Sequence, residues 1–86
     1  MAEAKKIQLK IEIDDVTAQG IYSNMASVFH TDSEIILDFM FIQPAHSQAR
    51  IRSRIITSPN HAKKFLKALK DNLQKYEKKF GAIKES

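Results

Sequence analysis

The sequence contains no cysteine and no tryptophan, and only two glycines and two prolines in 86 residues. Without cysteine, the chain can form neither a disulfide bond nor a thiolate metal site. Gly20 and Gly81 lie too far apart to build the glycine-rich backbone cradle that holds phosphate in many nucleotide-binding loops. No apolar stretch approaches the roughly 20 residues of a membrane span, and Met1–Lys6 lacks the apolar region of a signal peptide. The sequence therefore predicts a cytoplasmic protein with no membrane partner.

Motifs for catalysis and metal binding are absent as well. The histidines His30, His46 and His61 have no second histidine at the spacing that places two metal ligands on one helix face. The sequence has no nucleophile elbow, no zinc-protease motif and no lysine-containing phosphate loop. Its acidic residues form no pair suited to acid–base catalysis. We therefore expect a protein that is not an enzyme, with no catalytic residue, no metal site and no cofactor.

The chain is short for an independent domain, and 43% of its residues are hydrophobic. A chain of this length buries only about 60% of the surface that it exposes when unfolded, so its core is thin. Oligomerisation is a common way to extend such a core. We interpret residues 1–86 as a single domain that associates with copies of itself, as a homodimer or a higher oligomer.

Alternation of apolar and polar residues marks the first part of the chain. Ile7, Leu9, Ile11 and Ile13 alternate with polar residues, which is typical of a strand with one buried face. Residues 30–33 read as a tight hairpin turn, because their side chains readily bond to their own backbone. After a flexible lead at 1–5, strands are predicted at about 6–14, 21–29, 34–42 and 49–57.

A long helix is predicted at 59–80. Ser58 can cap its start, Pro59 suits the first helical position, and Gly81 suits the residue after its end. Six apolar residues recur at alternating steps of four and three and form what we call the apolar seam: Ala62, Leu66, Leu69, Leu73, Tyr76 and Phe80. The expected fold is α+β, a four-stranded antiparallel sheet followed by one long C-terminal helix packed on it. The spacing also permits the apolar seam to be shared with a second copy.

The strand predicted at 34–42 is apolar on both faces. Its second face carries Ile36, Met40 and Ile42, and a single helix can cover only one face of a sheet. Exposed apolar patches of this kind usually mark an interaction site. We therefore predict an oligomer interface at Ile36, Met40 and Ile42, with Leu73 and Tyr76 of the helix.

Basic residues form two groups. Arg50, Arg52 and Arg54 alternate along the fourth predicted strand, about 6.6–6.8 Å apart on one face, a spacing that could follow the phosphates of a single strand. Lys6 and Lys10 could extend this candidate nucleic-acid-binding site. The alternative is that these arginines form cross-strand ion pairs with Glu12, Glu34 or Asp38. The predicted helix carries seven lysines and two acidic residues, which suits either a polyanion-binding surface or a solvated face.

Residues along almost the whole chain resemble a known family in type and order. They are Gly20, Ile21, Tyr22, Ser23, Asn24, His30, Glu34, Asp38, Phe39, Pro44, Arg54, Ile55, Ile56, Thr57, Ser58, Pro59, His61, Ala62, Lys63, Leu69, Asn72, Tyr76, Glu77, Phe80, Gly81 and Ile83. From about Lys6 to Ile83, the chain resembles the domain-of-unknown-function family numbered 3467, a small bacterial and archaeal family with no established activity. In some bacteria its members are encoded beside the large RNA polymerase subunits, so the resemblance implies a role near transcription.

Two known folds share the predicted order of four strands and a helix. One belongs to dimeric transcription coactivators that bind single-stranded nucleic acid, and the other is the SecB-like fold of oligomeric export chaperones. Our leading hypothesis is a non-catalytic homo-oligomer that binds nucleic acid or a transcription complex, with RNA polymerase as a possible partner, through basic residues. The alternatives are a SecB-like peptide- or protein-binding chaperone and a structural assembly module.

Overall fold

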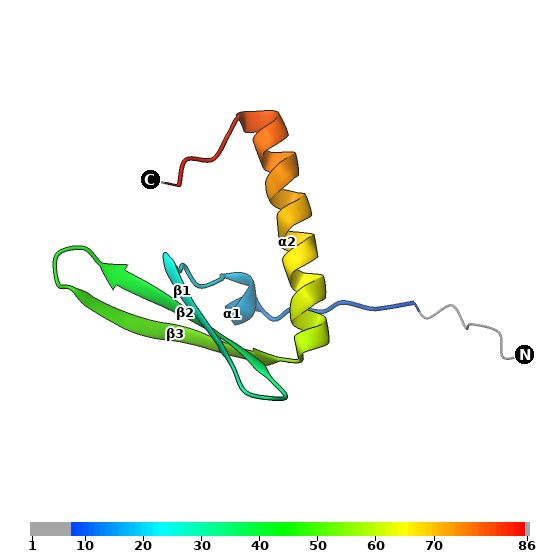
Figure 1. The fold of residues 1–86 in the computed structure, drawn as a ribbon, viewed down its shortest axis with the longest axis horizontal. Helices are drawn as coiled ribbons and strands as arrows, with labels where there is room; N and C mark the ends of the chain where they lie inside the picture. Colours follow the sequence, from blue (N-terminus) through cyan, green and yellow to red (C-terminus); the bar gives the residue numbers. More distant parts are fainter. Residues whose placement is uncertain (1–7, 86) are drawn as a thin grey trace, which may run out of the picture.

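The computed structural model describes residues 8–85. Its elements follow the order α1 (Asp15–Ala18), β1 (Met25–His30), β2 (Ile35–Gln43), β3 (Gln48–Thr57) and α2 (Pro59–Phe80). The strands form one antiparallel sheet in the order β1-β2-β3, and α2 rises steeply from one end of it (Figure 1). The α+β class and the C-terminal helix are confirmed.

Two hairpins build the sheet. Between β1 and β2, the Thr31 side chain accepts hydrogen bonds from the backbone N–H groups of Ser33 and Glu34, as expected for a turn that bonds to itself. Between β2 and β3, Ser47 adopts a φ of 51°, and the backbone N–H of His46 donates to the carbonyl of Gln43. Both connections are short, so β2 lies between its two sequence neighbours.

A β-bulge interrupts the pairing of β2 with β3. Phe39 lies opposite Ser53, but the next residue, Met40, lies opposite Ile51. Arg52 therefore has no counterpart on β2. Since successive side chains of a strand alternate between faces, one extra residue on β3 exchanges the faces on either side of the bulge.

The register assigns side chains to two faces of the sheet. The Asp38 face, as we call it, carries Met25, Phe29, Ile36, Asp38, Met40, Ile42, Ile51, Arg54 and Ile56. The Phe39 face carries Ala26, Val28, Ile35, Leu37, Phe39, Phe41, Arg50 and Ile55. Residues of α1 and the following loop line a hollow with Phe39, Ser53 and Ile55, so this segment lies over part of the Phe39 face.

The core within this chain is very small. Among residues 8–85, only Ile36 and Asp38 are buried, with exposed fractions of 8% and 3%. Both belong to the central strand, where side chains on β1 and β3 flank them. The sheet is therefore held mainly by its ladder hydrogen bonds and by side-chain contacts within each face.

The prediction of four strands was wrong for the part that the structure describes. Residues 8–14 lie in no strand, and their trace runs outward from the body (Figure 1). Leu9, Ile11 and Ile13 are 79%, 84% and 65% exposed. Alternation predicts an extended segment, but a strand also needs a hydrogen-bonded partner, and residues 8–14 pair with neither of the outer edges that β1 and β3 present. The predicted lead at 1–5 and Lys6 lie outside the described residues.

The position of α2 also differs from the prediction that it packs on the sheet. The helix spans the predicted range, and the Ser58 side chain accepts a hydrogen bond from the N–H of His61 at its start. However, the apolar seam from Leu66 to Phe80 is 43–66% exposed. Only Ser58 separates β3 from α2, and a residue before proline is held in extended conformation. This stiff junction directs the helix away from the sheet.

Candidate interaction surfaces

Asp38 and Arg54 form the strongest polar contact of the sheet. Nε of Arg54 donates to Oδ1 of Asp38 at 2.7 Å, and Nη2 donates to Oδ2 at 2.8 Å. These hydrogen bonds hold the pKa of the Asp38 carboxyl below its ordinary value, and the Arg54 charge lowers it further against the opposing effect of burial. The same hydrogen bonds raise the pKa of the Arg54 guanidinium. The pair therefore carries compensating charges into the middle of the Asp38 face.

Arg54 also covers an aromatic ring. Its Cζ lies 5.8 Å from the ring centroid of Phe29, a cation–π distance, and half of its side chain remains exposed. Asp38 occupies the Nε–Nη2 edge of the guanidinium and neutralises its charge, so Arg54 is a weaker phosphate ligand than an unpaired arginine. For Arg54, the cross-strand pairing with Asp38 that the sequence left open is confirmed.

The bulge separates the three arginines that the sequence placed on one face. Arg54 lies opposite Asp38, whereas Arg50 lies opposite Phe41, so these side chains belong to opposite faces of the sheet. Arg52 occupies the bulge between them. The prediction of a continuous arginine stripe is therefore wrong. Spacing of two residues places side chains on one face only where the strand is regular.

The remaining residues of the predicted nucleic-acid site are dispersed. Arg50 lines a hollow with Phe41, Gln43, His46 and Gln48 near the β2–β3 turn. Lys10 forms an exposed ion pair with Glu12 at 3.2 Å, and Lys6 lies outside the described residues. Within residues 8–85, Arg50 and Arg52 form no ion pair and remain exposed to solvent.

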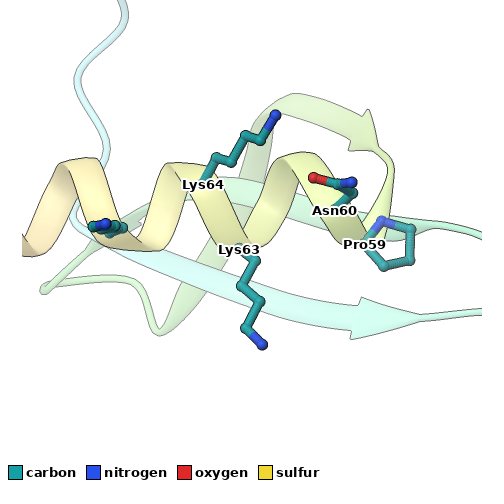
Figure 2. Close-up of a pocket in the computed structure, with 5 residues that line it drawn as sticks. Pro59, Asn60, Lys63 and Lys64 are labelled. Atoms are coloured by element: carbon teal, nitrogen blue, oxygen red, sulfur yellow. The ribbon is translucent and has the colours of Figure 1, made fainter.

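The largest basic surface lies on α2. At 100° per residue, four lysines lie opposite the apolar seam. They are Lys64, Lys67, Lys75 and Lys78. Figure 2 shows Lys63 and Lys64 projecting from the first turns of α2 in different directions, beside the hollow that Pro59 and Asn60 line. Asp71 and Glu77 are the only acidic residues of the helix, so the polar face keeps a net positive charge.

The apolar side of the molecule is largely open. Phe65 reaches the Phe39 face, where it lines a hollow with Leu37, Phe39 and Ile55. Beyond it, the seam extends past the sheet, and the Tyr76 and Phe80 rings lie against each other with centroids 5.0 Å apart. Of the residues predicted to form the oligomer interface, Ile36 is buried, Met40 and Ile42 are half-buried, and Leu73 and Tyr76 are exposed.

The sequence analysis did not predict two side chains, Asn24 and Ser23, that form hydrogen bonds with backbone groups of the sheet. The Asn24 amide donates to the carbonyl of Ile42 at 2.9 Å and accepts from the N–H of Ile42 at 2.8 Å, so it continues the β1–β2 ladder by one pair. The Ser23 hydroxyl lies 2.9 Å from the carbonyls of Met25 and Met40. Serine and asparagine inside the strand predicted at 21–29 were the available signal that β1 begins only at Met25, since both side chains readily bond to nearby backbone.

Two further polar contacts lie at helix ends, one at the start of α1 and one after the end of α2. Asp14 caps α1 by accepting from the N–H of Thr17, and this contact lowers the pKa of the Asp14 carboxyl. Glu77 accepts a hydrogen bond from the N–H of Ile83 at 2.9 Å, which folds the chain back after Gly81. These contacts account physically for the acidic residues at both positions.

Over the part of the chain that the structure describes, no three histidine, cysteine or acidic side chains come together in a way that could hold a metal ion. Within the same residues, no helix has the length and hydropathy required to cross a bilayer.

Comparison with known proteins places the chain in a family. No curated protein and no solved structure matches it. The sequence profile of one family, described as "Protein of unknown function (DUF3467)", matches residues 1–85, which is nearly the full length of the 86-residue chain. The chain therefore belongs to the DUF3467 family of proteins of unknown function.

Proposed function

We propose that the protein is a non-catalytic subunit of a cytoplasmic homo-oligomer that binds nucleic acid, or a transcription complex containing it, through the lysine-rich face of α2. The observation that carries this proposal is the segregation of α2 into an apolar seam and an opposite face with Lys64, Lys67, Lys75 and Lys78. A partner on the seam would leave the lysines facing solvent. Clustered lysines on an exposed face attract polyanions and release counterions on binding.

Arg50 and Arg52 support the same function from a second location. Both are exposed, and neither is neutralised by an acidic side chain among the described residues. Arg50 lies on the Phe39 face and Arg52 lies in the bulge, so their side chains do not form one row. This arrangement favours contacts with separate segments of a polyanion over contacts with successive phosphates of one strand. Arg54 stays with Asp38 in this proposal and stabilises the sheet.

The test is a titration with single- and double-stranded oligonucleotides at several salt concentrations. Each phosphate contact contributes a slope of about −0.7 in log K against log salt for single strands and about −0.9 for duplexes. The variant Lys64→Gln/Lys67→Gln/Lys75→Gln should lose about 2 units of single-strand slope if all three contacts are made. Arg50→Gln/Arg52→Gln, measured in parallel, reports how much the sheet contributes.

Asp71→Asn provides a control of opposite sign on the same helix, because it removes a negative charge and should tighten binding. Binding that is indifferent to salt, or equal affinity for the lysine variant and the natural chain, would exclude the lysine face as a nucleic-acid site.

A second candidate, a SecB-like chaperone for unfolded peptides, is supported by the open Phe39 face. Leu37, Phe39, Ile55 and Phe65 line an apolar hollow between the sheet and the base of α2. An extended peptide with apolar residues could occupy it, and suppression of aggregation of an unfolded client would favour this function. An assembly in which this hollow is filled by the protein itself would remove its basis.

A further inference from the structure

The structure leaves a far larger surface open than a folded chain of its mass requires. The accessible area is 8651 Å². A compact monomer of this mass has about 5,200 Å², which leaves an excess of roughly 3,400 Å². The eight residues outside the described range can account for at most about 1,250 Å² of this excess, which is the area of an unfolded segment of their mass. About 2,200 Å² therefore remains. Obligate dimers bury roughly 1,000–2,500 Å² on each subunit.

We propose that a second copy of the chain covers the apolar seam, with the two α2 helices packed antiparallel. This inference rests on the self-association in the proposed function, and it does not depend on nucleic-acid binding. The excess area is of the size that one subunit contributes to a permanent dimer, and the seam residues from Leu66 to Phe80, each 43–66% exposed, supply part of its apolar surface.

The shape of the seam selects a helix as its partner. From Leu66 onward, all apolar residues of α2 except Ala68 occupy the two core positions of each heptad, and the positions beside them are Lys70, Asn72, Glu77 and Lys79. A helix that packs on a sheet needs a wider apolar face, whereas a seam of two core positions matches a second helix. The junction at Ser58 and Pro59 also holds α2 away from its own sheet.

The charges beside the seam select the antiparallel orientation. With the helices centred near residue 71, Lys63 of one copy lies beside Glu77 of the other, twice by symmetry, whereas Lys70 and Asn72 each face their own counterpart once, so the two attractions outnumber the single lysine–lysine repulsion. The same register sets Tyr76 against Leu66 and the large Phe80 against the small Ala62. In the parallel arrangement, no lysine meets an acid across the seam. One oxygen of Glu77 binds the Ile83 N–H, which leaves the other free.

Disulfide trapping in the absence of nucleic acid tests the orientation, because the natural chain has no cysteine. We expect an oxidised mixture of Leu66→Cys and Tyr76→Cys chains to form the mixed 66–76 disulfide, since these core positions would meet within bonding range. A parallel pair would instead give 66–66 and 76–76 disulfides. Lys64→Cys, on the polar face, is the control that should not link. Dominant same-position disulfides would overturn the antiparallel proposal.

A seam variant tests the interface itself, with the dimer dissociation constant as its readout. Leu69→Glu/Leu73→Glu should raise the dimer dissociation constant by about 100-fold or more, because it places unpaired charges in a buried seam. Gln74→Glu adds a charge of the same sign on the opposite face and should leave the dissociation constant unchanged. A natural chain that sediments as a folded 9.8 kDa monomer would overturn the proposal. An intact dimer that binds no oligonucleotide would reject the nucleic-acid function alone.

Discussion

The sheet and α2 differ in how far contacts within one chain satisfy their side chains. The sheet completes its polar contacts within one chain: Asn24 extends the ladder, and Arg54 neutralises the buried Asp38. Helix α2 has good ends, with Ser58 at its start and Gly81 after its last turn, but its apolar seam lies open. In proteins, most of the stability of a helix comes from packing of its apolar face against other elements. The buried polar pair of the sheet is therefore satisfied within one chain, whereas the apolar seam of α2, like Phe29, Ile51 and Ile56 of the sheet, stays largely exposed there.

The largest expected effect is a loss of unfolding free energy in two matched alanine variants, one in the sheet and one in α2. Ile36→Ala removes the only buried apolar side chain in the described part and should cost about 2–5 kcal/mol of unfolding free energy. Leu69→Ala should lower stability by an amount that depends on protein concentration, because its cost falls on the contact between copies. Thermal unfolding of both variants over a dilution series measures this. Concentration-independent losses for both would mean that α2 is stabilised within its own chain.

A smaller effect concerns the polar completion of the sheet. Asn24→Ala removes two side-chain hydrogen bonds to the backbone of Ile42 and should cost about 1–2 kcal/mol, since water can partly replace them at this exposed edge. Asn24→Asp keeps the acceptor but sets a carboxylate oxygen against the Ile42 carbonyl, so its loss should equal or exceed that of the alanine variant. Denaturant unfolding provides the values, and equal stability of all three chains would show that the amide does not support the ladder.

The smallest effect is a dependence of stability on pH. The pKa of Asp38 is lowered in the folded chain by its hydrogen bonds with Arg54, so its contribution is fully present above the ordinary carboxyl pKa of about 4. This contribution is lost as pH falls through the lowered folded value. Solvent around the half-exposed Arg54 keeps the effect modest.

Asp38→Asn should therefore flatten the fall in stability below pH 4, measured as unfolding midpoints between pH 7 and pH 2. Asp14→Asn is the matched comparison, because the pKa of Asp14 is also lowered, by its contact with Thr17, and its removal should flatten the same range independently. An Asp38→Asn profile that follows the natural chain would show that the Arg54 contact contributes nothing in solution.

Local signals in the sequence were sufficient for β1, β2, β3 and α2, but they did not predict α1. The caps at Ser58 and Gly81 and the spacing of the apolar seam predicted α2 at its observed range, and alternation with turn residues predicted β1, β2 and β3 to within a few residues. These features depend on neighbouring residues along the chain, which the sequence displays directly. The family resemblance, confirmed over residues 1–85, rests on the same local motifs.

Features that depend on register or on packing between elements were not predictable in this way. The bulge at Arg52 is visible only when β3 is aligned against β2, and it divides the arginines between faces. Likewise, the alternation of Leu9, Ile11 and Ile13 describes a strand-like segment but not whether it pairs with an edge of the sheet. The seam spacing showed which residues of α2 share a face, without deciding between the sheet and a second copy as its cover.

Amide hydrogen exchange measured over a range of protein concentrations tests most directly whether α2 needs a second copy. Exchange in the interior of β2 should be slow and nearly constant at all concentrations where the chain is folded, while exchange along Leu66–Tyr76 should slow markedly as concentration rises. Equal, concentration-independent protection of α2 and β2 in dilute solution would contradict the account, because it would show that a single chain stabilises its own helix.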